Sequence, residues 1–368
     1  MYKRILVCVT NDLVTDQRVH KVCSSLMLHY PKGTIILLGR KKRNSLPLEK
    51  RNYLTHRMKL VFEFGFFFYA EYTIRLFFYI LFSRTSLIVS NDLDTLLPCY
   101  LASLLKRKKL VYDSHEIFTE VPELENRLFV KKCWENIEGF IFPKLKNVYT
   151  VNNQLADYFT TKYKVPVSIV RNVPMEPCKT ATKLSRNDLR IDPNNFLVIY
   201  QGSLNKDRGL EELIDSFALL PSHFSLLIVG SGDLENALKK RATNNKAIVF
   251  AGEVPFQELL SYTRLANLGV SLEKMNNLNY AFALPNKFFD YIHAGIPVLV
   301  SPLIAYKEML SKYDLGFLIE SHHPSDIATA IKRMENTPKT TMEINRFKHD
   351  FNWSREEKTL NDIYTAIY

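Results

Sequence analysis

Short, uninterrupted runs of apolar residues recur along most of this chain, and each is followed by a polar or glycine-containing turn and a helical pattern. A strand that is apolar throughout is buried on both faces, as in a parallel sheet covered by crossover helices. Repeated strand–helix units therefore predict a doubly wound α/β fold. The expected strands are Ile5–Val9, Thr34–Leu38, Ser86–Val89, Lys109–Tyr112, Asn147–Val151, Val167–Ile169, Phe196–Tyr200, Ser225–Val229, Ala247–Phe250, Leu268–Ser271, Pro297–Val300 and Gly316–Ile319.

A break in this pattern divides the chain in two. The stretch 171–192 contains two prolines and few large apolar side chains, which is typical of a linker, and the strand pattern restarts at Phe196. The length of 368 residues suits two domains. We therefore predict two Rossmann-like domains that face a central cleft. The expected parts are an N-terminal domain at 1–175, a linker at 176–192, a C-terminal domain at 193–350 and a helix at 351–368 that packs back toward the N-terminal domain.

The cysteines indicate a reducing compartment. They are scattered and include no C-x-x-C pair, which argues against a disulfide framework and against a structural zinc site. Export is not expected, because the N-terminal apolar run is too short for a secretory signal peptide. The five cysteines are Cys8, Cys23, Cys99, Cys133 and Cys178.

Positive charge is concentrated in the first half of the chain. The net charge is +11; residues 1–180 hold 28 Lys and Arg against 16 Asp and Glu, a net charge of +12, which leaves −1 for the rest. Such asymmetry predicts an anionic partner for the N-terminal domain. Nucleic acid is not expected, because no nucleic-acid-binding module accompanies the basic residues. An anionic membrane surface and a phosphorylated lipid remain, and the protein is expected in the cytoplasm, peripheral at the inner face of the cell membrane.

One segment, Leu60–Phe82, has eleven aromatic residues among 23, with Glu63, Glu71 and Arg75 as its only charges. Its length would allow a membrane span. A span would, however, place the strands before and after it on opposite sides of a bilayer, although both are expected in one sheet. Two interpretations remain open, a helix packed in the core and a helix that lies in a membrane interface.

The stretch Gln201–Leu213 (QGSLNKDRGLEEL) carries a candidate phosphate site. It places Gly202, Ser203, Lys206 and Arg208 between a buried strand and a helix, where backbone N–H groups and cations meet an anion. The alternative is an ordinary loop with solvated charges. The later Gly230-Ser231-Gly232 is a weaker signal, because it lacks the third glycine of a dinucleotide fingerprint.

A second candidate binding segment is Leu284–Val300 (LPNKFFDYIHAGIPVLV). Asn286, Lys287 and Asp290 are spaced so that they can share one helix face. A carboxylate there suits the hydroxyl pair of a ribose, and a lysine suits a phosphate. The alternative is an ordinary amphipathic helix.

Polar residues also follow three strands of the first half. His115, beside Glu116 in YDSHE, suits a substrate hydroxyl or developing charge, but a loop histidine that only makes hydrogen bonds is equally consistent. Asp16 and Arg18 in NDLVTDQR are candidates for the same cleft. The D-x-D of Asn91–Asp94 resembles a metal site, but we favour a helix cap there.

Taken together, these stretches resemble the glycosyltransferase family 4 group of retaining enzymes with GT-B architecture, of the bacterial polysaccharide-biosynthesis type. The resemblance spans nearly the whole chain. It rests on QGSLNKDRGLEELI, IVGSGDLENALKK, GEVPFQEL, LPNKFFDYIHAGIPVLVS, VYDSHEIFTE, VRNVP and FNWSREEKTLNDIY.

The resemblance implies transfer of a sugar, with retention, from a nucleotide-diphosphate donor on the C-terminal domain to a lipid-linked or oligosaccharide acceptor on the N-terminal domain. It implies no required metal or other cofactor. Arg208 matches the basic residue that stabilises the departing diphosphate, and Asp290 matches the acid that holds the ribose. His115 stands where the family often has a histidine near the transferred sugar. Gly202 and Gly230 match glycines that line the donor pocket.

The chain departs from the family pattern at Phe282, where an acid is usual, and at Ser203, where an arginine is usual. The second departure suggests that Lys206 or Lys287 supplies the missing positive charge. Two other functions remain open: a nucleotide-sugar epimerase of GT-B shape, which would need acid–base groups in the cleft, and a catalytically weak sugar-nucleotide-binding membrane protein.

Overall fold

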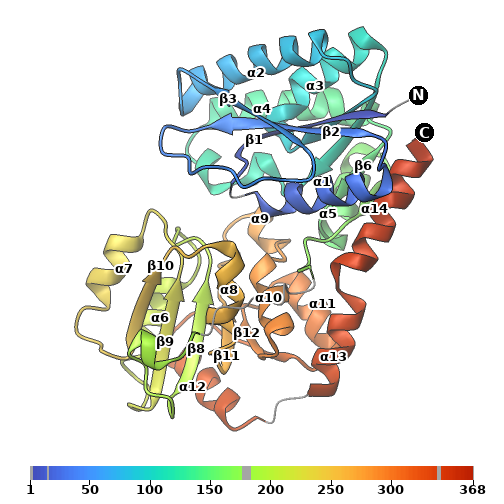
Figure 1. The fold of residues 1–368 in the computed structure, drawn as a ribbon. Helices are drawn as coiled ribbons and strands as arrows, with labels where there is room; N and C mark the ends of the chain where they lie inside the picture. Colours follow the sequence, from blue (N-terminus) through green and yellow to red (C-terminus); the bar gives the residue numbers. More distant parts are fainter. Residues whose placement is uncertain (1–2, 15, 176–183, 338–340, 368) are drawn as a thin grey trace. The chain divides into compact units, whose positions relative to one another are not determined.

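The computed structural model describes residues 3–14, 16–175, 184–337 and 341–367 (Figure 1). The chain forms two compact units. Unit 1 comprises Met1–Asn172 and Ser354–Tyr368, and unit 2 comprises Val173–Trp353. Each unit contains one parallel sheet with helices on its faces, which confirms the predicted α/β fold class. Residues 176–183 of the predicted linker, among them Cys178, lie outside the described residues.

Unit 1 contains a seven-stranded sheet in the order β3-β2-β1-β4-β5-β6-β7, and all of its paired strands are parallel. The order reverses between β1 and β4, which makes their carboxyl ends the place where a doubly wound sheet binds ligands. Six of the seven strands match predicted ones. The strands are β1 (Arg4–Asp12), β2 (Thr34–Lys41), β3 (Leu54–Lys59), β4 (Leu87–Asn91), β5 (Lys109–Ser114), β6 (Val148–Thr150) and β7 (Val167–Ile169).

Strand β3 was absent from the prediction, which was wrong here. Its sequence, LTHRMK, lacks a continuous apolar run, and only Met58 is buried. The reason is its position at the edge of the sheet, where it pairs with β2 alone. An edge strand needs far less apolar surface than a central one.

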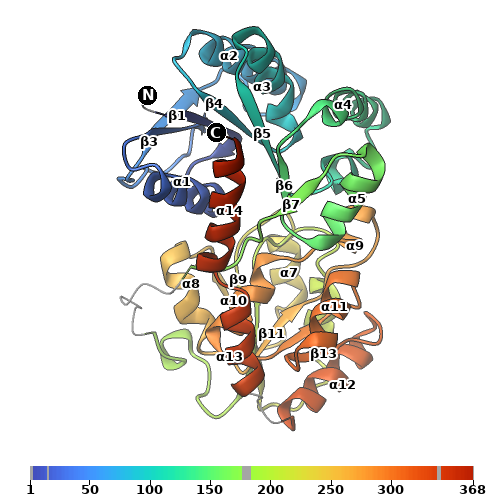
Figure 2. The ribbon, with the colours of Figure 1, turned by 90° about the vertical axis from the view of Figure 1, so that its right-hand side faces the viewer.

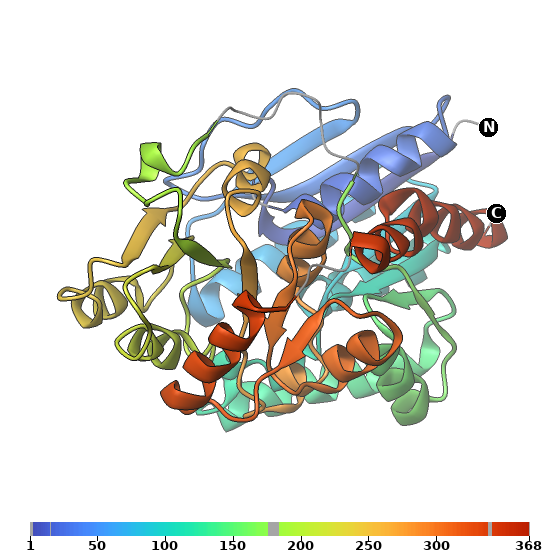
Figure 3. The ribbon, with the colours of Figure 1, turned by 90° about the horizontal axis from the view of Figure 1, so that it is seen from below.

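The helices of unit 1 cover both faces of this sheet. Helices α2 and α3 pack along each other on one face, and α1 lies on the other (Figures 1 and 2). The C-terminal helix α14 runs alongside α1 (Figure 3), and His29 bonds Thr365 at 3.0 Å. The helices are α1 (Gln17–His29), α2 (Gly65–Phe82), α3 (Leu93–Lys106), α4 (Leu128–Ile141), α5 (Asn153–Tyr163) and α14 (Trp353–Ile367).

Unit 2 contains a six-stranded parallel sheet in the order β10-β9-β8-β11-β12-β13, with its reversal between β8 and β11. All six strands match predicted ones. They are β8 (Phe196–Gln201), β9 (Phe224–Val229), β10 (Ile248–Gly252), β11 (Leu268–Ser271), β12 (Val298–Val300) and β13 (Gly316–Leu318). The helices are α6 (Leu210–Ser216), α7 (Glu235–Arg241), α8 (Phe256–Thr263), α9 (Leu278–Ala281), α10 (Asn286–Ala294), α11 (Ile304–Lys312), α12 (Pro324–Glu335) and α13 (Thr341–Asp350).

Candidate active site

Two glycines bring the loops after β8 and β9 into backbone contact. Gly202 has a φ of 127° and Gly230 a φ of 139°, conformations that favour glycine. A Cβ on Gly230 would stand 2.0 Å from the carbonyl oxygen of Gly202. The N–H of Gly202 also donates a hydrogen bond to the carbonyl of Val229 at 3.0 Å. The structure therefore places both glycines together, at the carboxyl ends of adjacent strands of unit 2.

Arg208 and Lys287 both reach the carboxylate of Glu273. Nζ of Lys287, in the first turn of α10, lies 2.8 Å from Oε1 of Glu273, and Nη1 of Arg208 lies 3.5 Å from the same oxygen. Each cation also lies over an aromatic ring. Lys287 Nζ is 4.1 Å from the ring centre of Tyr200, and Arg208 Cζ is 5.0 Å from that of Tyr280. The two cations predicted to contact phosphate are therefore neighbours.

Glu273 holds this pair of cations from inside the unit. Its side chain is fully buried, that of Lys287 is 8% exposed, and that of Arg208 is 21% exposed. Burial alone would raise the pKa of Glu273, but Lys287 and Arg208 outweigh it and lower that pKa to about 2. Its second oxygen accepts a hydrogen bond from Ser271 at 2.8 Å. The ionised carboxylate fixes two cations but balances the charge of only one, which leaves the partly exposed Arg208 able to bind an anion.

Asp290 lies less than one turn after Lys287 on α10. Its Oδ2 accepts a hydrogen bond at 3.0 Å from the side-chain amide of Gln201, whose own oxygen accepts one at 2.7 Å from Thr263. Asn286 is exposed whereas Lys287 is buried, because consecutive residues of a helix point about 100° apart. Of the three residues expected on one face, Lys287 and Asp290 face the carboxyl ends of the sheet, and Asn286 lies at the surface.

The structure distinguishes the two lysines proposed to replace the missing arginine at Ser203. A Cβ built on Gly202 would lie 3.8 Å from Lys287 Nζ. Lys206 is exposed on the loop. The carbonyl oxygen of Ser203 accepts a hydrogen bond from the Tyr200 hydroxyl at 2.8 Å, so Ser203 helps to fix the ring beneath Lys287. Of the two lysines, Lys287 is therefore the one that lies next to Gly202.

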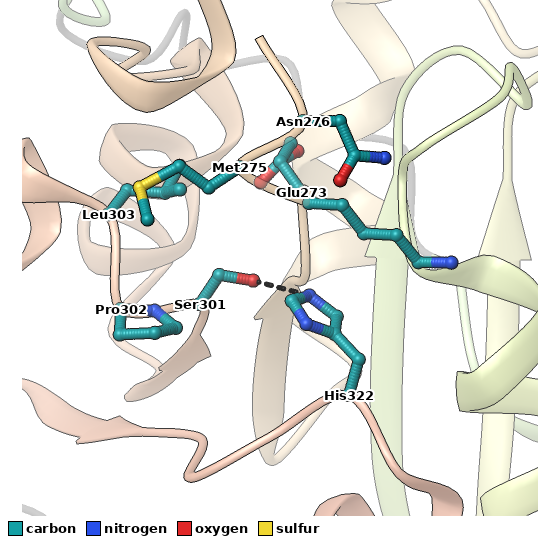
Figure 4. Close-up of a pocket in the computed structure, with 8 residues that line it drawn as sticks. Glu273, Met275, Asn276, Ser301, Pro302, Leu303 and His322 are labelled. Carbon is teal, nitrogen blue, oxygen red and sulfur yellow. Dashed lines mark hydrogen bonds between the residues drawn. The ribbon is translucent and has the colours of Figure 1, made fainter. Parts of the chain in front are cut away.

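A pocket of ≈ 300 Å³ opens beside Glu273, at the carboxyl ends of β11 and β12 (Figure 4). On one wall His322 lies against Ser301, with Nε2 3.0 Å from its Oγ. Asn276 and Glu273 lie on the strand-end segment across from them (Figure 4). The pocket shares Glu273 with the cation pair, so a ligand bound to these cations has space to extend beside them.

In unit 1, His115 lies between two carboxylates. Its Nδ1 is 2.9 Å from Oδ2 of Asp92 and its Nε2 is 3.2 Å from Oδ2 of Asp113. Arg18 makes two contacts with Asp113, at 2.7 and 3.2 Å. Burial alone would lower the pKa of His115, but Asp92 and Asp113 outweigh it and raise that pKa well above its usual value. The imidazole is therefore held as a cation at the carboxyl ends of β4 and β5.

Asp92 occupies the N-cap position of α3, in keeping with the expected helix cap, but its side chain makes no capping hydrogen bond there. Oδ1 accepts the backbone N–H of His115 at 2.8 Å instead, and the residue has a φ of 58°. A positive φ in a non-glycine residue is uncommon and tends to occur where a side chain has a positioning role. Asp92 positions both the backbone and the ring of His115.

Replacing Asp92 with Asn is expected to lower the pKa of His115, because one of its two carboxylate partners is lost. Asn tolerates a positive φ and keeps an oxygen for the N–H of His115. The pKa is measured by NMR titration of the imidazole protons in the wild type and in the variant. An unchanged pKa would mean that Asp92 does not stabilise the charged ring.

The ion pairs of His115 with Asp92 and Asp113 make the free energy of unfolding depend on pH. A histidine whose pKa is raised by folding stabilises the fold fully below its unfolded value of about 6.5, and the contribution is lost as the pH rises through the folded value.

Asp94, the other acid of the D-x-D, accepts a hydrogen bond from Thr10, and burial together with Asp92 raises its pKa to about 7. Within the described part of the chain, no group of three His, Cys, Asp or Glu residues is arranged to hold a metal.

The three residues expected on the acceptor side differ in their surroundings. Oδ1 of Asp16 accepts the backbone N–H of Val19 at 3.1 Å and caps α1. Arg18 is buried and paired with Asp113, which makes it a support for the His115 site rather than a surface residue. Glu116 is half-buried directly after His115. Contacts of these three residues with an acceptor stay a prediction.

Sequence reasoning missed Glu273 and Gln201 as site residues. Gln201 ends β8, and Glu273 follows β11 by two residues. Both obey the rule that polar residues directly after a buried parallel strand lie at the binding edge. The rule would have found them, but only the structure shows that Glu273 joins Arg208 to Lys287.

Comparison with known proteins agrees with this geometry. Residues 182–349 match the family model described as Glycosyl transferases group 1. This segment of the chain is therefore similar to glycosyltransferases of that group. The matched segment lies in unit 2 and contains Arg208, Glu273, Lys287 and Asp290.

Two curated relatives are named as glycosyltransferases. The chain is 24% identical over 198 residues to the D-inositol 3-phosphate glycosyltransferase of Pseudarthrobacter chlorophenolicus, a match that covers 50% of this chain and 46% of that protein. It is 22% identical over 197 residues to the capsular polysaccharide biosynthesis glycosyltransferase CapM of Staphylococcus aureus, which covers 49% of each. The chain thus spans about half the length of the curated relatives it matches.

Solved structures share the fold over the whole chain. Sucrose-phosphate synthase from Thermosynechococcus elongatus superposes with a TM-score of 0.77 at 15% identity, covering 99% of both chains. HepE from Anabaena, solved in complex with UDP, superposes with a TM-score of 0.69 at 14% identity, covering 99% of this chain and 100% of that one. The two Rossmann-like units are therefore those of the GT-B architecture.

Proposed function

We propose that this protein transfers a sugar, with retention, from a nucleotide-diphosphate donor to a lipid-linked or oligosaccharide acceptor in cell-surface polysaccharide biosynthesis. The observation that carries the proposal is the cation pair of Arg208 and Lys287. Both cations are fixed by one buried carboxylate at the carboxyl ends of β8 and β11, within the segment that matches glycosyltransferases.

The chemistry of sugar transfer fits this charge arrangement. Breaking the bond between the anomeric carbon and the diphosphate oxygen builds negative charge on the leaving group. Fixed cations and backbone N–H groups aimed at that charge lower the barrier, because they do not have to reorganise during the reaction. In the proposed front-face substitution, the acceptor oxygen bonds to the same face of the anomeric carbon, and its proton passes to the leaving phosphate.

Other residues have proposed roles on the two substrates. Asp290 would bind the ribose hydroxyls of the donor, since a carboxylate accepts two hydrogen bonds from such a pair. Gly202, Gly230, Ser203, Lys206 and Asn286 would surround the diphosphate from the two loops and from the start of α10. His115, held as a cation, would bind a hydroxyl of the transferred sugar. Unit 1 would bind the acceptor, with Asp16 and Glu116 as candidate contacts and Arg18 as a support of the His115 site.

Uridine diphosphate sugars are the first donors to test, because HepE was solved with UDP and with UDP-glucose. A capsular polysaccharide enzyme among the relatives supports a glycan acceptor. The cysteines Cys8, Cys23, Cys99 and Cys133 are free thiols, in keeping with a cytoplasmic location at the inner face of the membrane. The proposed donor and acceptor need no metal or other cofactor for binding to these side chains.

The test is to incubate the purified protein with a panel of uridine, guanosine and other nucleotide sugars and a membrane extract. Transfer of sugar into the lipid fraction, with the donor's anomeric configuration kept, supports the proposal. An isomerised nucleotide sugar without transfer would instead identify an epimerase. Binding without turnover would identify a sugar-nucleotide-binding protein, and either result would overturn the proposed reaction.

A further inference from the structure

Helix α2 is apolar on two opposite faces. Residues spaced four apart point into the core of unit 1 against β1, β2 and β4, and these are Phe68, Tyr72, Leu76 and Ile80. A second set spaced four apart lies about half a turn away. Its large members are between 49% and 80% exposed: Phe66, Ile74, Phe78 and Phe82. We call this set the aromatic ridge; a helix that only covers a sheet carries polar residues there.

The charges on α2 itself do not break the ridge. Glu71 accepts the backbone N–H groups of Val61 and Phe62 at the start of the helix, at 2.9–3.1 Å. Arg75 pairs with Glu71 at 2.7 Å and donates to the carbonyl of Lys59. Both side chains are therefore engaged in local contacts beside the helix, and the ridge stays apolar along its length.

Basic side chains stand at both ends of α2. At its start, the N–H of Arg43 binds Glu63 at 2.7 Å, which brings the exposed run Lys41–Arg43 to this end. At its end, Lys106 Nζ donates to the carbonyl oxygens of Leu81 and Ser83 at 2.7 and 2.8 Å. The exposed Arg84, Arg107 and Lys108 lie at the same end.

Helix α2 is long and apolar enough to cross a membrane. The sheet excludes that arrangement in this fold. Strand β3, before α2, and strand β4, after it, belong to the same parallel sheet and lie on one side of any bilayer. An apolar stripe bounded by cations is instead the pattern of a helix that lies in the membrane interface, with its aromatic residues at the acyl boundary and its cations at anionic headgroups.

We propose that the aromatic ridge of α2 inserts into the interface of an anionic lipid bilayer, with Lys41–Arg43 at one end and Arg84, Arg107 and Lys108 at the other binding the headgroups. The positive charge at both ends of α2 complements an anionic bilayer, whereas a neutral surface would not attract it. The inference needs no sugar transfer, and it is tested without substrates, so its failure and that of the proposed reaction are separate.

Co-sedimentation of the full chain with phosphatidylcholine–phosphatidylglycerol vesicles measures this interaction. We expect binding that weakens as salt rises and that is far weaker for phosphatidylcholine alone, because the headgroup attraction is screened. The double variant Ile74→Ser/Phe78→Ser should partition about 10-fold or more less strongly, since two apolar side chains no longer enter the interface. The matched control is Leu219→Ser, which changes a residue of similar exposure (52%) in unit 2.

Insertion itself is measured with Phe78→Trp and vesicles that contain brominated acyl chains. Quenching of the new fluorescence beyond that of the wild type, which has Trp134 and Trp353, supports the proposal even if the serine variant were to fold poorly. Three results would overturn it: no vesicle binding by the wild type, equal binding by the serine variant, or self-association in solution that the serine variant abolishes. The last would assign the ridge to a second copy of the chain.

Discussion

Replacing Arg208 with Ala is expected to reduce kcat about 100-fold or more, because one fixed cation no longer stabilises the departing diphosphate. Arg208 is 21% exposed and is held by Glu273 and by the ring of Tyr280, so the wild-type guanidinium is positioned before substrate arrives. Removal of such a group lowers the transition-state stabilisation more than ground-state binding. The effect is measured as kcat and KM for donor with saturating acceptor.

The matched control for this variant is Lys240→Ala, which removes an exposed cation of the same unit far along the chain from the site. Its kcat should equal that of the wild type. A normal kcat for Arg208→Ala, or an equal loss in both variants, would remove Arg208 from the reaction. Arg208→Lys separates charge from geometry, because a lysine keeps the charge but loses the planar fork.

Replacing Glu273 with Ala is expected to lower the free energy of unfolding by about 3 kcal/mol in the absence of nucleotide. Removing one partner of a buried ion pair leaves the other charge without compensation, and here Lys287 is only 8% exposed. A nucleoside diphosphate should recover part of the loss, since its phosphates would take the place of the carboxylate beside the cations. Chemical denaturation with and without UDP measures both effects.

Acid gives an independent check on this variant. Because the pKa of Glu273 is lowered to about 2, its stabilisation is complete above about pH 4.5 and is lost as the pH falls through about 2. The deficit of the variant should shrink over the same range. Glu308→Ala, which removes a surface pair with Lys312, should change stability by less than about 1 kcal/mol. A similar small change at Glu273 would show that the cations do not depend on it.

The fold was readable from the sequence wherever strands are buried on both faces. Continuous runs such as Ile5–Val9 and Phe196–Tyr200 fall inside β1 and β8 of the structure. Strand β3 escaped because an edge strand needs no apolar run. For Leu60–Phe82 the sequence left a core helix and an interfacial helix open, and α2 has one buried apolar face and one exposed apolar face.

The candidate site was only partly readable. The sequence predicts Arg208 and Lys287 independently, Arg208 because it follows a buried strand and Lys287 because it stands at the start of a helix. The structure places both cations at one carboxylate. The carboxylate, Glu273, belongs to no local pattern, because its partners lie 65 and 14 residues away in sequence. The role of Asp92 was predicted only in part, for the same reason. The local D-x-D predicts a cap, and Asp92 does stand at the N-cap of α3, but its carboxylate binds the N–H of His115 at the end of the next strand.

The most direct test of the account is a crystal structure of the protein with a bound nucleoside diphosphate. We expect the phosphate oxygens within hydrogen-bond distance of Arg208 and Lys287, next to Gly202, with the ribose at Asp290. A diphosphate bound elsewhere, or bound with both cations still turned only toward Glu273, would contradict the assignment of this site to a sugar-nucleotide donor.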